Sequence, residues 1–411
     1  MIKVLFVTWD GPGSFYLQSL FLPIFKLLRQ KNIIFYILQF TWAEKPEKLK
    51  LKQVCEDHGC IYLSVTVLRK PLSAGSLVTT FLGAYQIRKA IRSLGINIVM
   101  PRSTLPAVAS ILAMRAFPNV GLIFDADGLP HDERVEFGGM SPYSITYRLL
   151  RDFEALAVRR ADAVLTRSKK AIGILAARCG SGTKLEKFSV VANGRDTHHF
   201  KPSTIEERRL VRQSLSLDDK APLIVYVGSS LQGKYCGKQI FEFFQAVHAQ
   251  RSDTHLLLLT SSKEEANSLL LHYDELRSVC HIMQVPPNDV GLYLSACDLG
   301  VVFINQTFSM QSVSAIKLGE YLLCGIPIVS TSGIGDSDDL IARDVGYFLP
   351  TLSKNQLEEA AHWFVHSVLP DRAGFQQRSR DVGMEFFSLQ ASVDTYADVI
   401  KEVSSQTGSQ G

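Results

Sequence analysis

Hydrophobic and polar positions along this chain form two alternating patterns: short apolar runs, and longer segments with apolar residues at helical spacing. Alternation of this kind is typical of a parallel sheet whose strands are joined by crossover helices. One of the helical segments is Tyr143–Arg160. In the first half we predict strands at Val4–Thr8, Ile33–Gln39, Ile61–Val65, Ile96–Met100, Gly121–Phe124, Ala163–Thr166 and Phe188–Val191.

The same alternation restarts after residues 201–221, where Pro202, Pro222 and a charged run at 206–209 interrupt the pattern. We therefore expect a domain boundary near residue 200, with one domain at 1–200 and a second at 201–385. Two doubly wound α/β domains in series would form a cleft between the open ends of their sheets, where ligands bind. Predicted strands of the second domain are Leu223–Val227, His255–Thr260, His281–Met283, Leu299–Phe303 and Ile328–Ser330.

A helical pattern at Met384–Val403 follows the last predicted strand. We expect residues 386–403 to form a helix that crosses back to the first domain, and the polar residues 404–411 to be a disordered tail.

Length, charge and cysteine content narrow the class of protein. A chain of 411 residues exceeds what one hydrophobic core usually supports. No apolar run is long enough to span a bilayer, and the chain starts directly with a strand, so we expect a protein that is neither exported nor integral to a membrane. Seven scattered cysteines, an odd number, favour a reducing compartment and a cytoplasmic location.

The small net charge of +4 conceals a difference between the halves. Residues 1–200 contain 27 Lys and Arg against 15 Asp and Glu, and residues 201–411 contain 17 against 25. The basic first half would suit an anionic partner such as a phosphate-bearing lipid or the inner face of the plasma membrane. An ordinary solvated surface explains the same bias almost equally well.

The segment from Ser312 to Ser330 has the most specific chemistry. Ser312 or Ser314 is a suitable N-cap, the following residues have helical spacing, and Gly325 and Pro327 end the helix before a strand. Free backbone N–H groups at a helix start bind phosphate. Lys317 and Glu320 would lie on one face of that helix, where an ammonium group meets phosphate and a carboxylate accepts hydrogen bonds from ribose. An amphipathic helix with a solvated Lys and Glu would show the same periodicity.

Residues 317–321 (Lys-Leu-Gly-Glu-Tyr), with Gly325 and Pro327 behind them, resemble the donor-binding segment of retaining glycosyltransferases of family 4, which have the GT-B fold. Residues 154–168, 190–202 and 289–298 resemble other segments of the same family in the same order. The resemblance covers most of residues 150–350 and implies transfer of a sugar from a nucleotide diphospho-sugar to a glycan or lipid-linked acceptor, without a metal or other cofactor. It also implies that the domain at 1–200 binds the acceptor and the domain at 201–385 binds the donor. Retention of the anomeric configuration and a role in cell-surface polysaccharide or glycoconjugate biosynthesis are further implications of the resemblance.

Within the donor segment, the resemblance makes Ser312, Ser314, Ala315, Ile316, Lys317 and Glu320 candidate donor-binding residues. Ser312 stands where the family has the first of two glutamates, so the charge usually placed near the reacting sugar is missing. The linker motif at 193–196 reads as a tight turn and is expected to be structural.

Two glycine-containing loops follow predicted strands and are candidates for contacting phosphate. In residues 228–238, Gly228 and Ser229 are expected to bind the donor, and Lys234 or Lys238 is expected to stabilise the leaving phosphate. Ser229 replaces the arginine usual in the family. In the first domain, Gly11 and Gly13 are candidates because the corresponding family loop approaches the donor phosphate.

An acidic segment at 124–133 follows another strand of the first domain. Asp127 is a candidate catalytic residue, and Asp125, His131 and Glu133 are candidates for the acceptor side. Asp125 and Asp127 occupy the region where family members often carry a histidine. Neither this segment, nor Cys55 with Cys60, nor His198 with His199 has convincing metal-ligand spacing, so no metal is expected.

Two other classes remain open: a nucleotide-sugar epimerase with the same architecture, and a non-catalytic nucleotide-sugar-binding scaffold. Nucleic acid is not an expected partner. The donor sugar, its base, the acceptor and the oligomeric state are not specified by these patterns.

Overall fold

The computed structural model describes residues 1–68, 72–180 and 182–408, and it contains two compact units. Unit 1 consists of Met1–Ala192 together with the C-terminal segment from Leu389, and unit 2 consists of Asn193–Ser388. The chain thus leaves unit 1 before the boundary predicted at residue 200, and its last helix belongs to unit 1.

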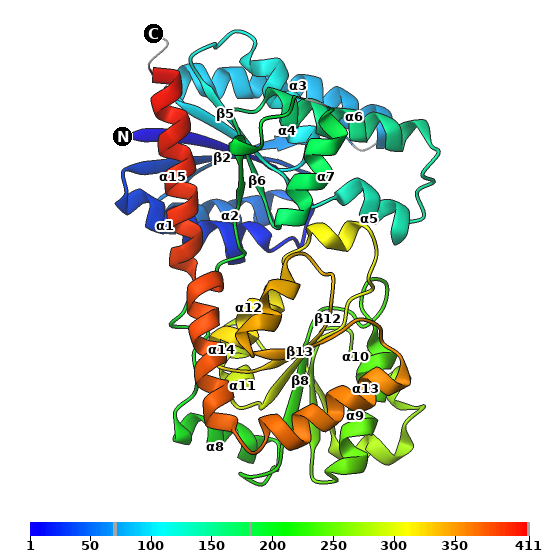
Figure 1. Cartoon of the computed structure of the whole chain (residues 1–411). Coiled ribbons are helices and arrows are strands. Elements are labelled where there is room, and N and C mark those ends of the chain that lie inside the picture. Colours follow the sequence, from blue (N-terminus) through cyan, green and yellow to red (C-terminus); the bar gives the residue numbers. More distant parts are fainter. Residues whose placement is uncertain (69–71, 181, 409–411) are drawn as a thin grey trace. The chain divides into compact units, whose positions relative to one another are not determined.

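Unit 1 is built on a parallel sheet with the strand order β3-β2-β1-β4-β5-β6-β7 (Figure 1). The strands are β1 Ile2–Trp9, β2 Ile33–Thr41, β3 Ile61–Thr66, β4 Ile98–Pro101, β5 Gly121–Asp125, β6 Ala163–Thr166 and β7 Phe188–Val190. The helices are η1 Leu17–Phe21 (a π-helix), α1 Leu22–Gln30, α2 Lys45–Asp57, α3 Leu72–Leu94, α4 Thr104–Met114, α5 Pro130–Glu136, α6 Ile145–Arg160, α7 Lys169–Cys179, η2 Leu185–Lys187 (3-10) and α15 Leu389–Gly408.

Alternation along β1 explains why helices cover both faces of this sheet. Val4 and Phe6 are buried in a core with η1, α1 and α15, whereas Leu5 and Val7 are buried in a core with α3 and α4. Successive side chains of a strand point to opposite faces, so the unbroken apolar run from Val4 to Val7 needs a helical layer on each side.

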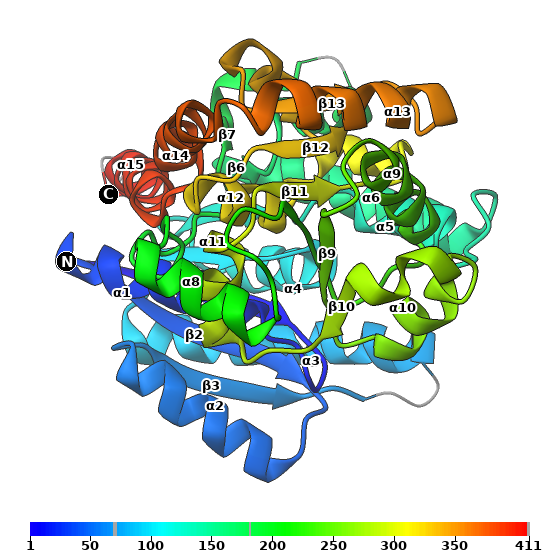
Figure 2. The ribbon, with the colours of Figure 1, turned by 90° about the horizontal axis from the view of Figure 1, so that it is seen from below.

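Unit 2 repeats this plan with the strand order β10-β9-β8-β11-β12-β13, and all its strand pairs are parallel. Helices α9, α10 and α13 cover one face, and α8, α11, α12 and α14 lie on the other (Figure 2). The strands are β8 Leu223–Val227, β9 His255–Leu259, β10 Cys280–Met283, β11 Leu299–Val302, β12 Ile328–Thr331 and β13 Gly346–Leu349.

The α-helices of unit 2 are α8 Ile205–Ser214, α9 Gly237–Gln250, α10 Lys263–Leu270, α11 Val290–Ser295, α12 Ile316–Leu323, α13 Lys354–Trp363 and α14 Arg372–Phe387. The 3-10 segments are η3 Asp274–Val279, η4 Pro287–Asp289, η5 Ser309–Ser312 and η6 Ser337–Arg343, and the π-helix η7 covers Phe364–Val368.

Every strand predicted from the sequence is present, which confirms two doubly wound α/β domains. Three details differ. Strand β13 was not predicted, because Gly346 and the half-buried Tyr347 and Phe348 weaken its apolar pattern. The single helix predicted from Met384 is split at Ser388, whose extended backbone separates α14 from α15. Helix α15 continues to Gly408, so residues 404–408 are helical rather than a disordered tail. Residues 409–411 of that predicted tail lie outside the described residues.

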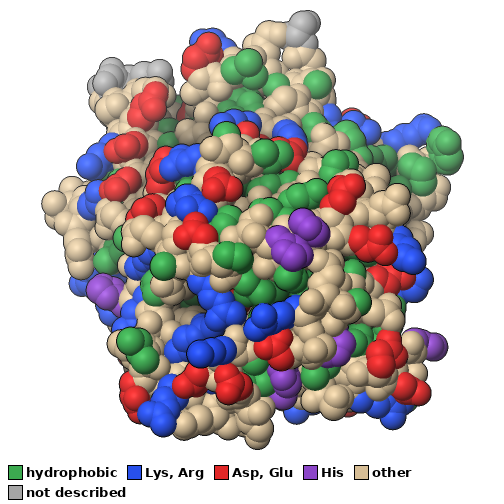
Figure 3. Space-filling view, turned by 60° about the horizontal axis from the view of Figure 1, so that its bottom comes forward, with side chains coloured by type: hydrophobic (Ala, Val, Ile, Leu, Met, Phe, Trp, Pro, Cys, Tyr) green, Lys and Arg blue, Asp and Glu red, His purple; other side chains and the backbone are tan. Residues whose placement is uncertain are grey.

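Surface charge is mixed on the face shown in Figure 3, where Lys and Arg side chains are interspersed with Asp, Glu and hydrophobic ones. Among the described residues, no helix is both long and apolar enough to cross a membrane. The seven cysteines are all free thiols.

Candidate functional site

The strand order of unit 2 defines a switch point between β8 and β11. The chain winds outward in opposite directions from these neighbouring strands, so the loops at their carboxyl ends diverge and leave a crevice for ligands. An isolated antiparallel bridge between Tyr235 and Ile304 ties the loop after β8 to the loop after β11. The predicted glycine-containing loop therefore lies at the position where doubly wound folds bind ligands.

Helix α12 faces this crevice but starts later than the sequence predicted. It begins at Ile316 with Ala315 as the N-cap, and neither Ser312 nor Ser314 caps it. Ser312 belongs to the separate 3-10 turn η5, where it is buried and its hydroxyl donates to the Ser309 carbonyl at 2.7 Å. The prediction that a serine caps the helix is therefore wrong. The Ser312 hydroxyl is engaged in a local hydrogen bond within η5, before the helix begins.

Ser314 is held through its backbone. Its carbonyl oxygen accepts a hydrogen bond from the side-chain amide of Asn193 at 2.7 Å. The linker motif at 193–196 thus fixes the segment that leads into α12, in line with the structural role expected for it. The N-cap residue Ala315 has no side-chain oxygen, so it cannot accept a hydrogen bond from the backbone N–H groups of the first helical turn.

Lys317, in the first turn of α12, is nine-tenths buried. Its Nζ lies 4.1 Å from the ring centre of Tyr226 and 4.2 Å from that of Tyr235, so two aromatic faces flank the ammonium group. Among the described residues, no hydrogen-bond acceptor is within reach of Nζ. Burial lowers the pKa of Lys317 to about 7; Glu320 opposes this change and Lys234 adds to it. An anion with acceptor oxygens would satisfy this group.

Glu320 follows one turn later on the same face and is also buried. One carboxylate oxygen, Oε1, accepts from the guanidinium of Arg195 at 2.9 Å. Burial raises the pKa of Glu320, and Arg195 opposes the rise. A carboxylate can accept about four hydrogen bonds, so Glu320 keeps capacity for hydroxyl donors such as a ribose diol.

Tyr321 anchors α12 to the sheet. Its hydroxyl accepts a hydrogen bond from the backbone N–H of Val227, the last residue of β8, at 2.8 Å. A Cβ at Gly300 of β11 would lie 2.3 Å from the Tyr321 ring, so the ring needs a glycine beneath it. This close packing fixes the helix at the switch point and thereby positions Lys317 and Glu320.

Gly228 brings the backbone of the loop next to Lys317. A Cβ at this position would lie 2.5 Å from the Tyr226 hydroxyl and 3.1 Å from the Lys317 Nζ. Only a residue without a side chain fits here. The neighbouring Ser229 is exposed, and its carbonyl accepts from the Ser262 hydroxyl at 2.6 Å.

The two candidate lysines of this loop have different surroundings. Lys234 is half-buried, its Nζ lies 5.9 Å from the Tyr235 ring, and its charge contributes to the lowered pKa of Lys317. Lys238 is exposed on α9 and forms an i,i+4 ion pair with Glu242 at 3.0 Å, which raises the pKa of Lys238. The geometry thus groups Lys234, not Lys238, with Lys317.

In unit 1, Gly11 and Gly13 follow β1 at the corresponding switch point between β1 and β4. A Cβ on Gly11 would lie 2.5 Å from the Trp42 ring. Gly13 has a φ of +74°, and its N–H donates to Glu47 at 3.0 Å. Steric fit and a left-handed backbone explain both glycines. Contact with a donor phosphate stays a prediction.

Two of the predicted acidic site residues of unit 1, Asp125 and Asp127, are paired with arginines. Asp125 is fully buried, and both of its oxygens accept from Arg167, at 2.7 and 2.9 Å. A ligand could reach the Asp125 carboxylate only if its ion pair with Arg167 opened. Asp127 is different: its carboxylate pairs with Arg102 at 2.7 Å and is 42% exposed. Of the two, Asp127 retains access to a ligand.

His131 and Glu133 lie in the first turn of α5. His131 is buried, its Nε2 lies 2.7 Å from the Thr104 hydroxyl, and burial lowers its pKa to about 4. Glu133 is half-buried. Their acceptor-side roles stay predictions. Within the described residues, no three His, Cys, Asp or Glu side chains are grouped as a metal site would require.

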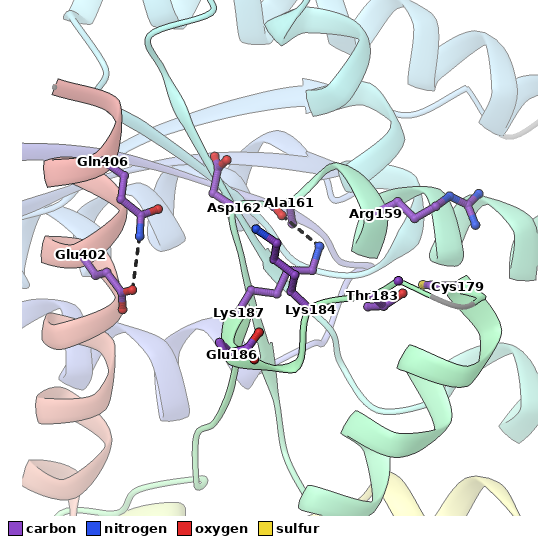
Figure 4. Close-up of a pocket in the computed structure, with 11 residues that line it drawn as sticks. Arg159, Ala161, Asp162, Cys179, Thr183, Lys184, Glu186, Lys187, Glu402 and Gln406 are labelled. Carbon is purple, nitrogen blue, oxygen red and sulfur yellow. Dashed lines mark hydrogen bonds between the residues drawn. The ribbon is translucent and has the colours of Figure 1, made fainter. Parts of the chain in front are cut away.

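A cavity of about 560 Å³ in unit 1 lies elsewhere (Figure 4). Ala161 and Asp162 precede β6 and Lys187 precedes β7, so the cavity is at the amino ends of the strands. Its central ammonium group, on Lys187, already donates to the carbonyls of Val158 and Ala161. Ligands of this fold class bind at the opposite edge, so we do not consider this cavity the site.

Four residues of the unit 2 site were not among the predicted site residues: Asn193, Arg195, Tyr226 and Tyr235. Tyr226 precedes the predicted glycine-containing loop and Tyr235 lies within it, and these positions were the only signal that the sequence offered for the two tyrosines. Arg195 lies far from Glu320 along the chain, so no local pattern could indicate their ion pair.

No protein-family model and no curated protein matches the sequence of this chain. Solved structures do match its fold. Anabaena Alr3699/HepE, crystallised in complex with UDP, is 16% identical, with 98% of this chain and 100% of that chain covered and a TM-score of 0.71. A glycosyltransferase from Rickettsia africae is 14% identical, with 98% of both chains covered and a TM-score of 0.74. A putative UDP-N-acetylglucosamine 2-epimerase from Listeria monocytogenes is 14% identical, with 98% and 96% covered and a TM-score of 0.61. The TM-scores over nearly complete chains show a shared fold, and at these low identities the likeness extends to the fold alone. This chain has the GT-B fold, with two parallel-sheet α/β domains.

Proposed function

We propose that this protein is a glycosyltransferase that transfers a sugar from a nucleotide diphospho-sugar to a glycan or lipid-linked acceptor. The observation that carries the proposal is the buried Lys317 ammonium group, which has no hydrogen-bond acceptor within reach among the described residues and lies beside the Gly228 backbone. Burying a charge without a partner is costly, and such groups are concentrated at binding sites.

Charge supports a diphosphate as the group that binds there. Lys317, Lys234 and Arg195 contribute three positive charges against one negative charge from Glu320 when Lys317 is protonated. A nucleotide diphospho-sugar carries two negative charges on its diphosphate. The first backbone N–H groups of α12 add the positive end of a helix dipole to the same region.

Spacing supports a nucleoside attached to that diphosphate. Glu320 is three residues beyond Lys317, or roughly 4.5 Å along the helix axis. A carboxylate at this distance can accept hydrogen bonds from the 2′- and 3′-hydroxyls of ribose while Lys317 meets the phosphates. Fold relatives crystallised with UDP are compatible with this donor class.

In the reaction that we propose, the acceptor hydroxyl oxygen bonds to the anomeric carbon as the bond from that carbon to the diphosphate breaks. The bonding electrons leave with the nucleotide diphosphate, and the acceptor proton passes to the departing phosphate oxygen. Lys317 and Lys234 stabilise the growing negative charge, which is the demanding part of the step. We propose Asp127, the accessible carboxylate of unit 1, as the group that orients the acceptor hydroxyl. The anomeric configuration of the product, measured by NMR, tests the retention that we propose.

These cations lead us to propose that no divalent metal or other cofactor is required. Turnover should survive excess EDTA, and a strict need for Mg²⁺ or Mn²⁺ would contradict this part.

The free thiols of all seven cysteines support the proposed cytoplasmic location. A lipid-linked acceptor in cell-surface polysaccharide synthesis would place the reaction at the inner face of the membrane.

Ligand binding gives the first test. Thermal stability of the purified protein should rise with UDP, GDP, ADP or dTDP, or with their sugars, and the rise should be larger for the ligand that binds more tightly. We expect one base to be preferred and Lys317→Met to abolish the shift. No shift with any nucleotide, measured on folded protein, would contradict the proposal.

An epimerase is the second candidate, favoured by the fold match to a putative UDP-N-acetylglucosamine 2-epimerase. Incubation of the preferred donor without acceptor distinguishes the two: an epimerase isomerises the donor alone, whereas a transferase leaves it intact until an acceptor is added. Nucleotide binding without turnover on a broad acceptor panel would instead indicate the non-catalytic scaffold.

A further inference from the structure

Helix α3 of unit 1 has an exposed apolar stripe that neither the donor site nor the core uses. Phe81 is 65% exposed and Tyr85 66%, and Val78 and Leu82 are exposed beside them. At 3.6 residues per turn these four positions fall within an arc of roughly 100° on one side of the helix. Exposed apolar residues are usually scattered, so a contiguous group on one helix indicates an interaction surface.

The opposite side of α3 packs into the core, which keeps this stripe facing outward. Ile87, Ala90 and Ile91 are buried in the core against β1, β2 and α4. A Cβ on Gly83 would lie 2.5 Å from the Phe40 ring, so helix and sheet are in direct contact there. Helix α3 cannot rotate to hide Phe81 and Tyr85 without losing that core.

The same stripe becomes basic toward the end of the helix. Lys89 and Arg92 are exposed and continue the positions of Phe81 and Tyr85 by one and two turns. The sequence of α3 contains no Asp or Glu. Arg88, beside them, is engaged with the carbonyls of Leu112 and Ala113. The stripe thus combines aromatic and aliphatic side chains with two outward cations and no anion.

We propose that this stripe, which we define as Val78, Phe81, Leu82, Tyr85, Lys89 and Arg92, docks unit 1 on an anionic lipid bilayer. Aromatic rings settle at the level of the headgroups, and lysine and arginine pair with lipid phosphates there. A second copy of this chain fits less well, because its stripe would provide no carboxylate to pair with Lys89 and Arg92. The inference concerns unit 1 and does not depend on nucleotide binding by unit 2.

Flotation of the full-length protein with phosphatidylcholine vesicles, with and without phosphatidylglycerol, tests the proposal. We expect flotation with the anionic vesicles, and a decrease as salt is raised. Phe81→Ser with Tyr85→Ser should reduce the lipid-bound fraction about tenfold. Lys89→Gln with Arg92→Gln should reduce binding about fivefold per charge removed and abolish the preference for anionic lipid.

Leu271→Ser is the matched control, because Leu271 is an exposed apolar residue of unit 2 and should not affect flotation. Circular dichroism and nucleotide binding of each variant separate loss of the surface from loss of folding or of the donor site. The proposal is overturned if wild-type protein floats with neither vesicle, or if both double variants float like wild type. It is equally overturned if light scattering shows a dimer that the Phe81 and Tyr85 changes dissociate while lipid binding is absent.

Discussion

The Nζ atom of Lys317 lies 4.1 Å from the ring centre of Tyr226, and the position that a Cβ of Gly228 would occupy is 3.1 Å from the same nitrogen. An ammonium group is thus enclosed between aromatic faces and a backbone that has no side chain. Water is largely excluded from Nζ, so a phosphate that enters gains a strong interaction with little competition from solvent.

Replacing Lys317 with Met should remove binding while stabilising the fold. Methionine keeps the length of the side chain without the buried charge, so the free energy of unfolding should rise by roughly 2 kcal/mol near pH 7. Binding of UDP and of inorganic pyrophosphate should both be lost in calorimetry. A variant that is less stable and still binds pyrophosphate would contradict the assignment of Lys317.

The stability difference between wild type and Lys317→Met should depend on pH. The pKa of Lys317 is about 7 in the folded protein, whereas its ordinary value of 10.5 applies in the unfolded chain, so the unfolded chain binds more protons between these values. Wild-type stability therefore gains with pH in this window, and the advantage of the variant shrinks. Urea unfolding of both proteins from pH 7 to 10 measures this, and a constant difference would be inconsistent with a lowered pKa.

Binding of a UDP-sugar should weaken as the pH rises above about 7, by at most tenfold per pH unit. The donor diphosphate has no titration in this range, so the change reports on the protein. At pH 8 binding should take up a proton, because phosphate favours protonated Lys317 over the neutral form. Calorimetry in HEPES and in Tris, whose ionisation enthalpies differ, detects this uptake. Glu320, Lys234, Tyr226 and Tyr235 surround Lys317. Any binding that Lys317→Met retains, measured in the same two buffers, gives the proton uptake that these neighbours contribute.

Glu320→Gln should show whether Glu320 binds the ribose of the donor or its phosphates. The change preserves the shape of the side chain but weakens its acceptance of hydroxyl donors, so affinity for UDP should fall about tenfold. Affinity for pyrophosphate, which has no ribose, should stay within about threefold. Equal losses for both ligands would indicate that Glu320 acts only through its ion pair with Arg195.

Lys234→Gln and Lys238→Gln form a matched pair, one in the loop after β8 and one in the first turn of α9. Lys234 influences Lys317, whereas Lys238 is paired with Glu242 at the surface. Removing Lys234 should lower affinity for the diphosphate and lower kcat, because it also stabilises the leaving group. Removing Lys238 should change neither by more than about twofold, since exposed i,i+4 pairs contribute little. The reverse pattern in titrations and initial rates would exchange the two assignments.

Asp125→Asn and Asp127→Asn should separate structure from activity in unit 1. Asp125→Asn leaves the buried Arg167 without its counter-charge and should cost about 3 kcal/mol or more of stability. Asp127→Asn removes a carboxylate that is 42% exposed but pairs with the buried Arg102, so it should cost less stability than Asp125→Asn while it lowers kcat. Thermal unfolding and turnover, measured on both variants, check this. Full activity of Asp127→Asn would remove it from the proposed reaction.

Strand and helix positions could be predicted because each depends on a local pattern. A strand such as Leu223–Val227, apolar at every position, can only be buried between two helical layers, and its periodicity is visible in the sequence. The limits of this approach appear at β13, which is half-buried, and at Ser312, where hydrogen bonding inside a short turn overrode the helix-start signal.

By itself, then, the sequence determined two doubly wound α/β domains and the residue types that accompany phosphate binding, including Lys317, Glu320, and either Lys234 or Lys238. Tertiary structure alone decided which of these residues meet. It brought the rings of Tyr226 and Tyr235 next to the Lys317 ammonium group, paired Glu320 with Arg195, and separated Asp125 from solvent. The physical reason is that burial and ion pairing depend on neighbours distant along the chain, and periodicity describes only neighbours that are near.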